Sequence, residues 1–239
     1  VDEKGERIPL TVAGADIEEG TITLVCHEVG KTTRRLGSLK EGDCILDLLG
    51  PLGKPAEIRK FGTVLCVGGG VMVAPLHFQA MAFREAGNEV IGVVGAKTEN
   101  QLIFEDKMRE VCNELYVATD DGTKGQRGLD FIKDLFKERK IDRVVAVGPI
   151  VMMKTVSELT LPFGIPTIVN LIPIMVDGMG MCGACRVTVG GKTMFACVDG
   201  PDFDGHQVDF EELMVRMKMY TSQEKLAFVF HEKGGRSFE

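Results

Sequence analysis

The alternation of β-branched and helix-like segments after Phe61 limits this chain, more than any other feature, to one class of fold. Four apolar, valine-rich runs are separated by helical lengths of chain, and they cover residues 63–67, 89–94, 114–118 and 143–147. The stretches between them carry apolar residues at three-to-four spacing, over 75–86, 101–111 and 128–140. This alternation predicts a parallel, doubly wound sheet with helices on its faces.

The two ends of the chain have other patterns. Residues 7–59 contain short candidate strands, such as 21–27 and 43–48, between glycine turns, which predicts a small antiparallel barrel or part of one. From about Leu171 the sequence predicts a cysteine loop, a hairpin over 185–195 and a helix over 209–219. We therefore expect an α/β plus β fold in three regions, which are residues 1–60, 61–170 and 171–239.

Composition excludes several classes of protein. The 239 residues are 44% hydrophobic and 26% charged, as in ordinary globular proteins. A formal net charge of -7 with scattered basic residues argues against nucleic acid as a partner. No apolar run approaches the roughly 20 residues that span a bilayer, so we expect no membrane partner. Seven cysteines without a secretory signal fit a reducing, cytoplasmic location.

A glycine-rich loop follows the first valine-rich run. Gly68, Gly69 and Gly70 come directly after that run, and Pro75 begins the next helical stretch. In this context glycines let backbone N–H groups approach a pyrophosphate, so the loop indicates a nucleotide site. Val73 stands where a third spaced glycine would fall, and a plain turn before a packed helix is the alternative.

Two acidic residues follow the third run of the predicted sheet. Asp120 and Asp121 are placed to accept hydrogen bonds from ribose hydroxyls and to repel a 2′-phosphate, which favours NADH over NADPH. Lys97, Lys124 and Arg127 lie nearby in sequence and weaken that charge argument. The alternative is a solvated turn in which the acids cap the next segment.

The cysteine loop has the spacing of an iron-sulfur site. A plant-type 2Fe-2S centre takes thiolates at C-x4-C-x2-C with a fourth further on. Asp177, Cys182 and Cys185 have this spacing, Cys197 closes the set, and a carboxylate therefore occupies the first position. A structural zinc ion held by the same four residues is the alternative. A disulfide is less favoured, because the cysteine total is odd and there is no secretory context.

These motifs together resemble the ferredoxin-NADP reductase superfamily. The resemblance implies an FAD site in three segments and two loops on the nicotinamide side. The FAD segments are the R-x-P-L-T strand (Arg7, Pro9, Leu10, Thr11), the G-K-T-T turn (Gly30, Thr32, Thr33) and the G-P-L-G loop (Gly50, Leu52, Gly53). The nicotinamide loops are the Gly68 to Pro75 loop and the segment with Gly148, Pro149 and Met152. Family members have barrel strands before the first motif, so we expect the barrel to be incomplete.

The cluster segment resembles one branch of that superfamily. The branch contains dihydroorotate dehydrogenase electron-transfer subunits and the small subunits of NADH-dependent ferredoxin:NADP oxidoreductases. In the dihydroorotate group the first cluster ligand is a cysteine, whereas the second, electron-bifurcating group is similar to this chain in having an aspartate there. Asp177 therefore makes the chain resemble the second group.

The resemblance implies an oxidoreductase subunit that carries electrons between NAD(H), with NADP(H) possible, FAD and the cluster. It implies a larger flavin and iron-sulfur partner similar to the glutamate synthase small subunit, and ferredoxin through that complex. Hydride transfer needs no acid-base residue, and we predict none. The alternatives are a dihydroorotate dehydrogenase electron-transfer subunit and a zinc-structured nucleotide-binding module without turnover.

Overall fold

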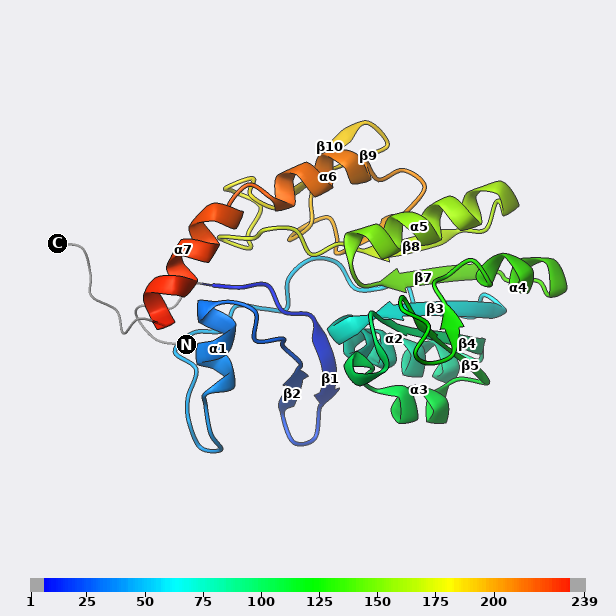
Figure 1. Ribbon diagram of the computed structural model, residues 1–239, viewed down its shortest axis with the longest axis horizontal. Helices are drawn as coiled ribbons and strands as arrows, with labels where there is room; N and C mark the ends of the chain where they lie inside the picture. Colours follow the sequence, from blue (N-terminus) through cyan, green and yellow to red (C-terminus); the bar gives the residue numbers. More distant parts are fainter. Residues whose placement is uncertain (1–6, 233–239) are drawn as a thin grey trace.

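A seven-stranded sheet forms the centre of the structure (Figure 1), a computed structural model that describes residues 7–232. Its strand order is β11-β8-β7-β3-β4-β5-β6, and every neighbouring pair is parallel except β11 with β8. The strands are β3 (Thr63–Gly69), β4 (Glu89–Ala96), β5 (Glu114–Thr119), β6 (Gln126–Arg127), β7 (Arg143–Val147), β8 (Thr167–Asn170) and β11 (Asp202–Asp204). The four valine-rich runs are β3, β4, β5 and β7, so the predicted parallel sheet is confirmed.

Helices cover both faces of this sheet. One face carries α2 (Val73–Glu85) and α3 (Glu105–Val111), and the other carries α4 (Ile132–Glu138) and α5 (Ile150–Thr160). Alternate residues of β3 enter the two cores, with Val64 and Cys66 on the α2 side and Leu65 and Val67 on the other. Single 3₁₀ turns occur at Gly70–Met72, Glu99–Gln101 and Leu161–Phe163. Within residues 7–232 no helix is both long and apolar enough to cross a membrane.

The N-terminal region differs from the predicted barrel. It contains a two-stranded hairpin, β1 (Val12–Asp16) with β2 (Thr21–Leu24), and the short helix α1 (Lys31–Gly37). The prediction of a strand over 43–48 is wrong, because these residues form no strand in the structure. A strand needs a neighbour for its N–H and C=O groups, and no described strand pairs with this segment. A closed antiparallel barrel is therefore not confirmed within residues 7–60.

The C-terminal region returns to the sheet. The expected hairpin is confirmed as β9 (Arg186–Val189) and β10 (Lys192–Phe195), with Gly190 and Gly191 at φ 57° and 73° in its turn. The expected helix is α6 (Phe210–Met217), and Asp209 caps it by accepting from the Glu212 N–H at 2.9 Å. Residues of β9, β11 and α6 share one core with β3 and α5, and the last helix, α7 (Thr221–Glu232), lies beside α1 (Figure 1). The predicted regions 1–60 and 171–239 also include residues 1–6 and 233–239, which lie outside the described part.

Candidate functional site

The cysteine loop depends on three glycines. Gly178, Gly180 and Gly183 have φ of 74°, 79° and 70°, a left-handed conformation that side chains with a Cβ rarely adopt. A Cβ at Gly180 would also stand 2.6 Å from Cγ2 of Val198. The loop therefore requires these glycines, which let the chain bend between the expected ligands.

Backbone N–H groups hold the Asp177 carboxylate. Oδ1 accepts from the Met179 N–H at 2.9 Å, and Oδ2 accepts from the Cys182 N–H at 2.7 Å. These hydrogen bonds, first from Met179 and then from Cys182, hold the pKa of Asp177 below its usual range. The carboxylate is thus ionised at neutral pH and folded back onto the loop that carries Cys182.

Cys185 and Cys197 form the second half of the site. Both are buried, and their sulfurs lie 3.1 Å apart, which is longer than a disulfide bond. Burial, reinforced by the neighbouring Cys185, raises the pKa of Cys197 to about 11. The Cys182 side chain is exposed, and its sulfur accepts from the Ala184 N–H at 3.4 Å.

The four predicted ligands are therefore arranged as two pairs, Asp177 with Cys182 and Cys185 with Cys197. Two pairs suit a two-iron cluster, in which the protein supplies two ligands to each iron. A structural zinc ion instead needs four donors around one point. In the described part of the chain no three His, Cys, Asp or Glu side chains lie close enough together to hold a metal ion of any kind. The pairing of the donors fits a two-iron cluster, and the ligand set stays a prediction.

Arg216 anchors this loop from outside. Its Nη2 donates to the Ala184 carbonyl oxygen at 2.9 Å, which ties α6 to the segment between Cys182 and Cys185. Arg216 was not predicted as part of the site. The only available signal was its position in the last turn of a predicted helix, which does not indicate a contact with the loop.

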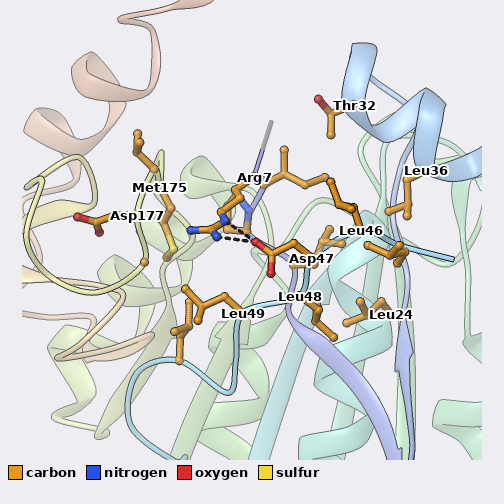
Figure 2. A pocket seen from close by; sticks show the side chains of 17 residues that line it. Arg7, Leu24, Thr32, Leu36, Leu46, Asp47, Leu48, Leu49, Met175 and Asp177 are labelled. Atoms are coloured by element: carbon orange, nitrogen blue, oxygen red, sulfur yellow. Dashed lines mark hydrogen bonds and ion pairs between the residues drawn. The ribbon is translucent and has the colours of Figure 1, made fainter. Parts of the chain in front are cut away.

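A cavity of about 310 Å³ joins the first expected flavin motif to the cluster loop (Figure 2). Its size is at the lower end of the range for ligand pockets. Five predicted flavin residues line it, which are Arg7, Pro9, Leu10, Thr32 and Leu52. The cluster loop supplies the other wall, with Met175, Val176, Asp177 and Gly178. Two of the predicted sites, far apart in sequence, therefore share one cavity.

Several cavity residues were not predicted. Asp47 accepts from Nε of Arg7 at 3.1 Å, and apolar side chains complete the lining, namely Ile8, Leu24, Leu36, Ile45, Leu46, Leu48 and Leu49. The leucine-rich run from residue 45 carries no motif, and its position between glycine turns predicts a strand. The apolar character of this run indicates that it packs against something, but it does not indicate that the cluster loop forms the opposite wall of the cavity.

The other predicted flavin residues do not line the cavity. Gly30 is the N-cap of α1, and its N–H donates to Oγ1 of Thr33 at 3.0 Å. Gly53 lies against Gly200, where a Cβ would meet the Gly200 carbonyl oxygen at 2.2 Å. Thr11 and Gly50 are not among the residues that line the cavity.

The two predicted nicotinamide loops are neighbours at the carboxyl edge of the sheet. Gly68 pairs with Val147, and a Cβ at Gly69 would stand 2.6 Å from Sδ of Met152 and 2.9 Å from Cδ of Pro149. Both loops lead into helix N-termini, with Pro75 buried in the first turn of α2. Between β3 and β7 the strand order reverses, which is the usual ligand position in open α/β sheets.

Asp120 and Asp121 lie at the same edge, after β5. Oδ1 of Asp121 accepts from the Thr123 N–H at 3.0 Å and from its hydroxyl at 2.7 Å, and these bonds lower the pKa of Asp121. Asp121 thus caps its own turn, as the alternative interpretation expects. Asp120 is exposed beside it.

Comparisons with known proteins agree with this arrangement. Residues 173–209 match the family described as the iron-sulfur cluster binding domain of dihydroorotate dehydrogenase B. A Thermotoga maritima protein named as a homolog of the electron transfer subunit of dihydroorotate dehydrogenase B (NAD(+)) is 53% identical over 95% of this chain and 80% of its own length. An uncharacterized Clostridium beijerinckii protein is 47% identical over 98% of this chain and 82% of its own length.

A solved structure is also similar over nearly the whole chain. It belongs to an NADH-dependent reduced ferredoxin-NADP oxidoreductase and was described for its insights into flavin-based electron bifurcation. The two chains are 51% identical, with a TM-score of 0.91, over 97% of this chain and 84% of the other.

Proposed function

This chain belongs to the family of dihydroorotate dehydrogenase B electron-transfer subunits and their homologues, and from that membership we propose how its residues serve an electron-transferring oxidoreductase. It acts with NAD(H), FAD and an iron-sulfur cluster, as a subunit of a larger complex. Its role is to pass electrons between the nucleotide, the flavin and the cluster.

The observation that carries this proposal is the cavity shared by the flavin motif and the cluster loop. Arg7 and Thr32 approach it from the N-terminal region, whereas Asp177 approaches it from the cluster loop (Figure 2). A subunit that moves electrons between a flavin and a cluster must hold the two side by side. The shared lining supports that arrangement.

The chain's own residues bind and orient the groups. Asp177, Cys182, Cys185 and Cys197 hold the cluster, which supplies one-electron chemistry where NADH supplies electrons in pairs. Gly68 and Gly148 lack the Cβ that would meet Leu76 and Met152, so the strand ends pack close to the helices whose N-termini a dinucleotide would approach at the sheet edge. The side chains of Leu46, Leu48 and Leu49 give the flavin side of the cavity an apolar wall. The division into regions 1–60, 61–170 and 171–239 and a cytoplasmic location are parts of the same proposal.

The partner is a larger flavin and iron-sulfur subunit similar to the glutamate synthase small subunit, through which ferredoxin is reached in an electron-bifurcating complex. The 51% identity to the solved oxidoreductase chain and the carboxylate at position 177 favour this partner. The family name favours the second candidate, in which the partner forms orotate.

Anaerobic purification of the complex from native cells tests the proposal. We expect FAD, iron and acid-labile sulfide together with a larger iron-sulfur flavoprotein. A partner that oxidises dihydroorotate would instead support the second candidate. Zinc at one atom per chain, without iron, sulfide or flavin, would exclude electron transfer.

Asp177→Cys tests the carboxylate ligand directly. We expect the variant to keep two irons per chain but to change the electron paramagnetic resonance spectrum and the midpoint potential of the reduced protein, because thiolate is a softer donor than carboxylate. Asp130→Cys is the matched control, since it adds a thiol at an aspartate whose side chain is 88% exposed and lies outside the cluster loop. A spectrum unchanged in Asp177→Cys would show that Asp177 is not a ligand.

A further inference from the structure

The turns after β4 and β5 form one hydrogen-bonded unit. The Asp120 N–H donates to the Ala96 carbonyl oxygen at 3.1 Å, and the Asp121 N–H donates to that of Lys97 at 3.3 Å. The Glu99 N–H donates to Oγ1 of Thr123 at 2.9 Å. The unit lies at the carboxyl ends of β4 and β5, the two strands that follow β3 on one side of the sheet. In open α/β sheets this is where the ribose of a dinucleotide is recognised.

Carboxylates hold the lysine of this unit. Nζ of Lys124 lies 2.8 Å from Oε2 of Glu105 and 3.9 Å from Oε1 of Glu99. The other oxygen of Glu105 accepts from Nη2 of Arg109 at 2.9 Å, so Glu105 is itself fixed on α3. The hydrogen bond to Glu105 raises the pKa of Lys124.

The backbone of Lys124 is fixed as well. Its N–H donates to Oγ1 of Thr119 at 3.0 Å, and the Thr119 hydroxyl donates back to its carbonyl oxygen at 2.9 Å. Because Thr119 is buried, this reciprocal pair fixes the main chain of Lys124. From that fixed point the ion pair with Glu105 directs the lysine side chain toward α3.

We propose that the Glu99–Lys124–Glu105 network, together with exposed Asp120, selects NAD(H) over NADP(H) by withholding Lys124 from a 2′-phosphate. This inference rests on the proposed dinucleotide site. A 2′-phosphate brings up to two negative charges to the unit. There it meets four carboxylates and four cations, and Glu105 already holds two of the cations, Lys124 and Arg109; the eight residues are Glu99, Glu105, Asp120, Asp121, Lys97, Arg109, Lys124 and Arg127.

Two adenine nucleotides that differ only in the 2′-phosphate test the proposal. Isothermal titration calorimetry of the full chain measures the dissociation constants of 5′-ADP and 2′,5′-ADP. We expect Glu99→Gln with Glu105→Gln to improve 2′,5′-ADP binding by about tenfold and to leave 5′-ADP binding unchanged. Adding Lys124→Gln to that pair should remove the gain, whereas Lys124→Gln in the otherwise unchanged protein should have little effect.

Glu114→Gln is the matched control. It also removes one carboxylate from an ion pair, with Nη2 of Arg139 at 2.9 Å, but at the amino end of β5. An equal gain in this control would mean that net charge, and not the network, governs selection, and would overturn the inference. So would an unchanged nucleotide ratio in the double variant when 5′-ADP still binds. Failure of 5′-ADP to bind the unchanged protein would instead contradict the dinucleotide site itself.

Discussion

At the scale of single residues, the candidate cluster site combines two kinds of ligand environment. The Asp177 carboxylate lies at the exposed end of the loop and is stabilised as an anion by two backbone N–H groups. Cys197 is buried against Cys185, and its raised pKa keeps the thiol protonated until a metal binds. The proposed cluster would therefore displace a proton from Cys197, whereas the carboxylate is already charged.

Gly180→Ala tests how far the loop conformation governs retention of the cluster. The left-handed φ should cost about 1–2 kcal/mol, and the contact with Val198 adds to it. We expect a lower unfolding temperature and fewer irons per chain. Gly191→Ala is the control, because φ there is 73° but its Cβ would meet nothing within 4 Å. Equal iron loss in both variants would show that iron retention follows general stability and not the conformation of the cluster loop.

At the scale of elements, local patterns predicted well and distant pairings did not. The valine-rich runs predicted β3, β4, β5 and β7 because burial on both faces leaves a continuous apolar signal. The short strand β11 has no such signal, and it pairs with β8 across a long separation in sequence. The same reason explains the site: the loop spacing predicted the four ligands, but nothing local indicated that Met175 and Leu49 would line one cavity.

The strand β11 brings the half-buried carboxylate of Asp202 to the edge of the sheet, and its ionisation gives a pH test. Burial raises the pKa of Asp202, although Nδ2 of Asn170 donates to its Oδ1 at 2.8 Å. Below about pH 4 the carboxyl is protonated in the folded and unfolded chains alike. As the pH rises, the unfolded chain ionises first, so the contribution of Asp202 to stability is lost up to and through its raised folded pKa.

We therefore expect the unfolding free energy of the unchanged protein to fall, relative to Asp202→Asn, as the pH rises from about 4 toward neutrality. Urea denaturation at one-unit intervals measures this difference. Asp130→Asn is the control for losing one carboxylate, since the Asp130 side chain is 88% exposed. A difference that stays flat, or rises with pH, would contradict a raised pKa at Asp202.

At the scale of the whole molecule, a short linker joins the N-terminal region to the sheet. The Phe61 ring lies between two guanidinium groups, with Cζ of Arg143 at 4.2 Å and Cζ of Arg59 at 4.7 Å from its centroid. Oε2 of Glu57 lies 3.2 Å from Nη2 of Arg143, which places this contact on the first residue of β7. The linker is thus attached to the same strand that carries the Gly148 loop at its other end.

Arg143→Gln should release this linker. Losing the ion pair and the ring contact should raise the population of locally opened chain by about tenfold, equivalent to about 1.4 kcal/mol. Trypsin cleaves after Arg59 and Lys60, so limited digestion followed by mass spectrometry reports the opening. Arg139→Gln removes one arginine that pairs with Glu114 outside the linker, and we expect its linker to be cut at the original rate. Equal rates in both variants would mean that Arg143 does not hold the two parts together. Faster cutting in Arg143→Gln alone would show that this side chain helps to hold the linker, beside the hydrogen bonds that Asn88 makes with Arg59 and Phe61.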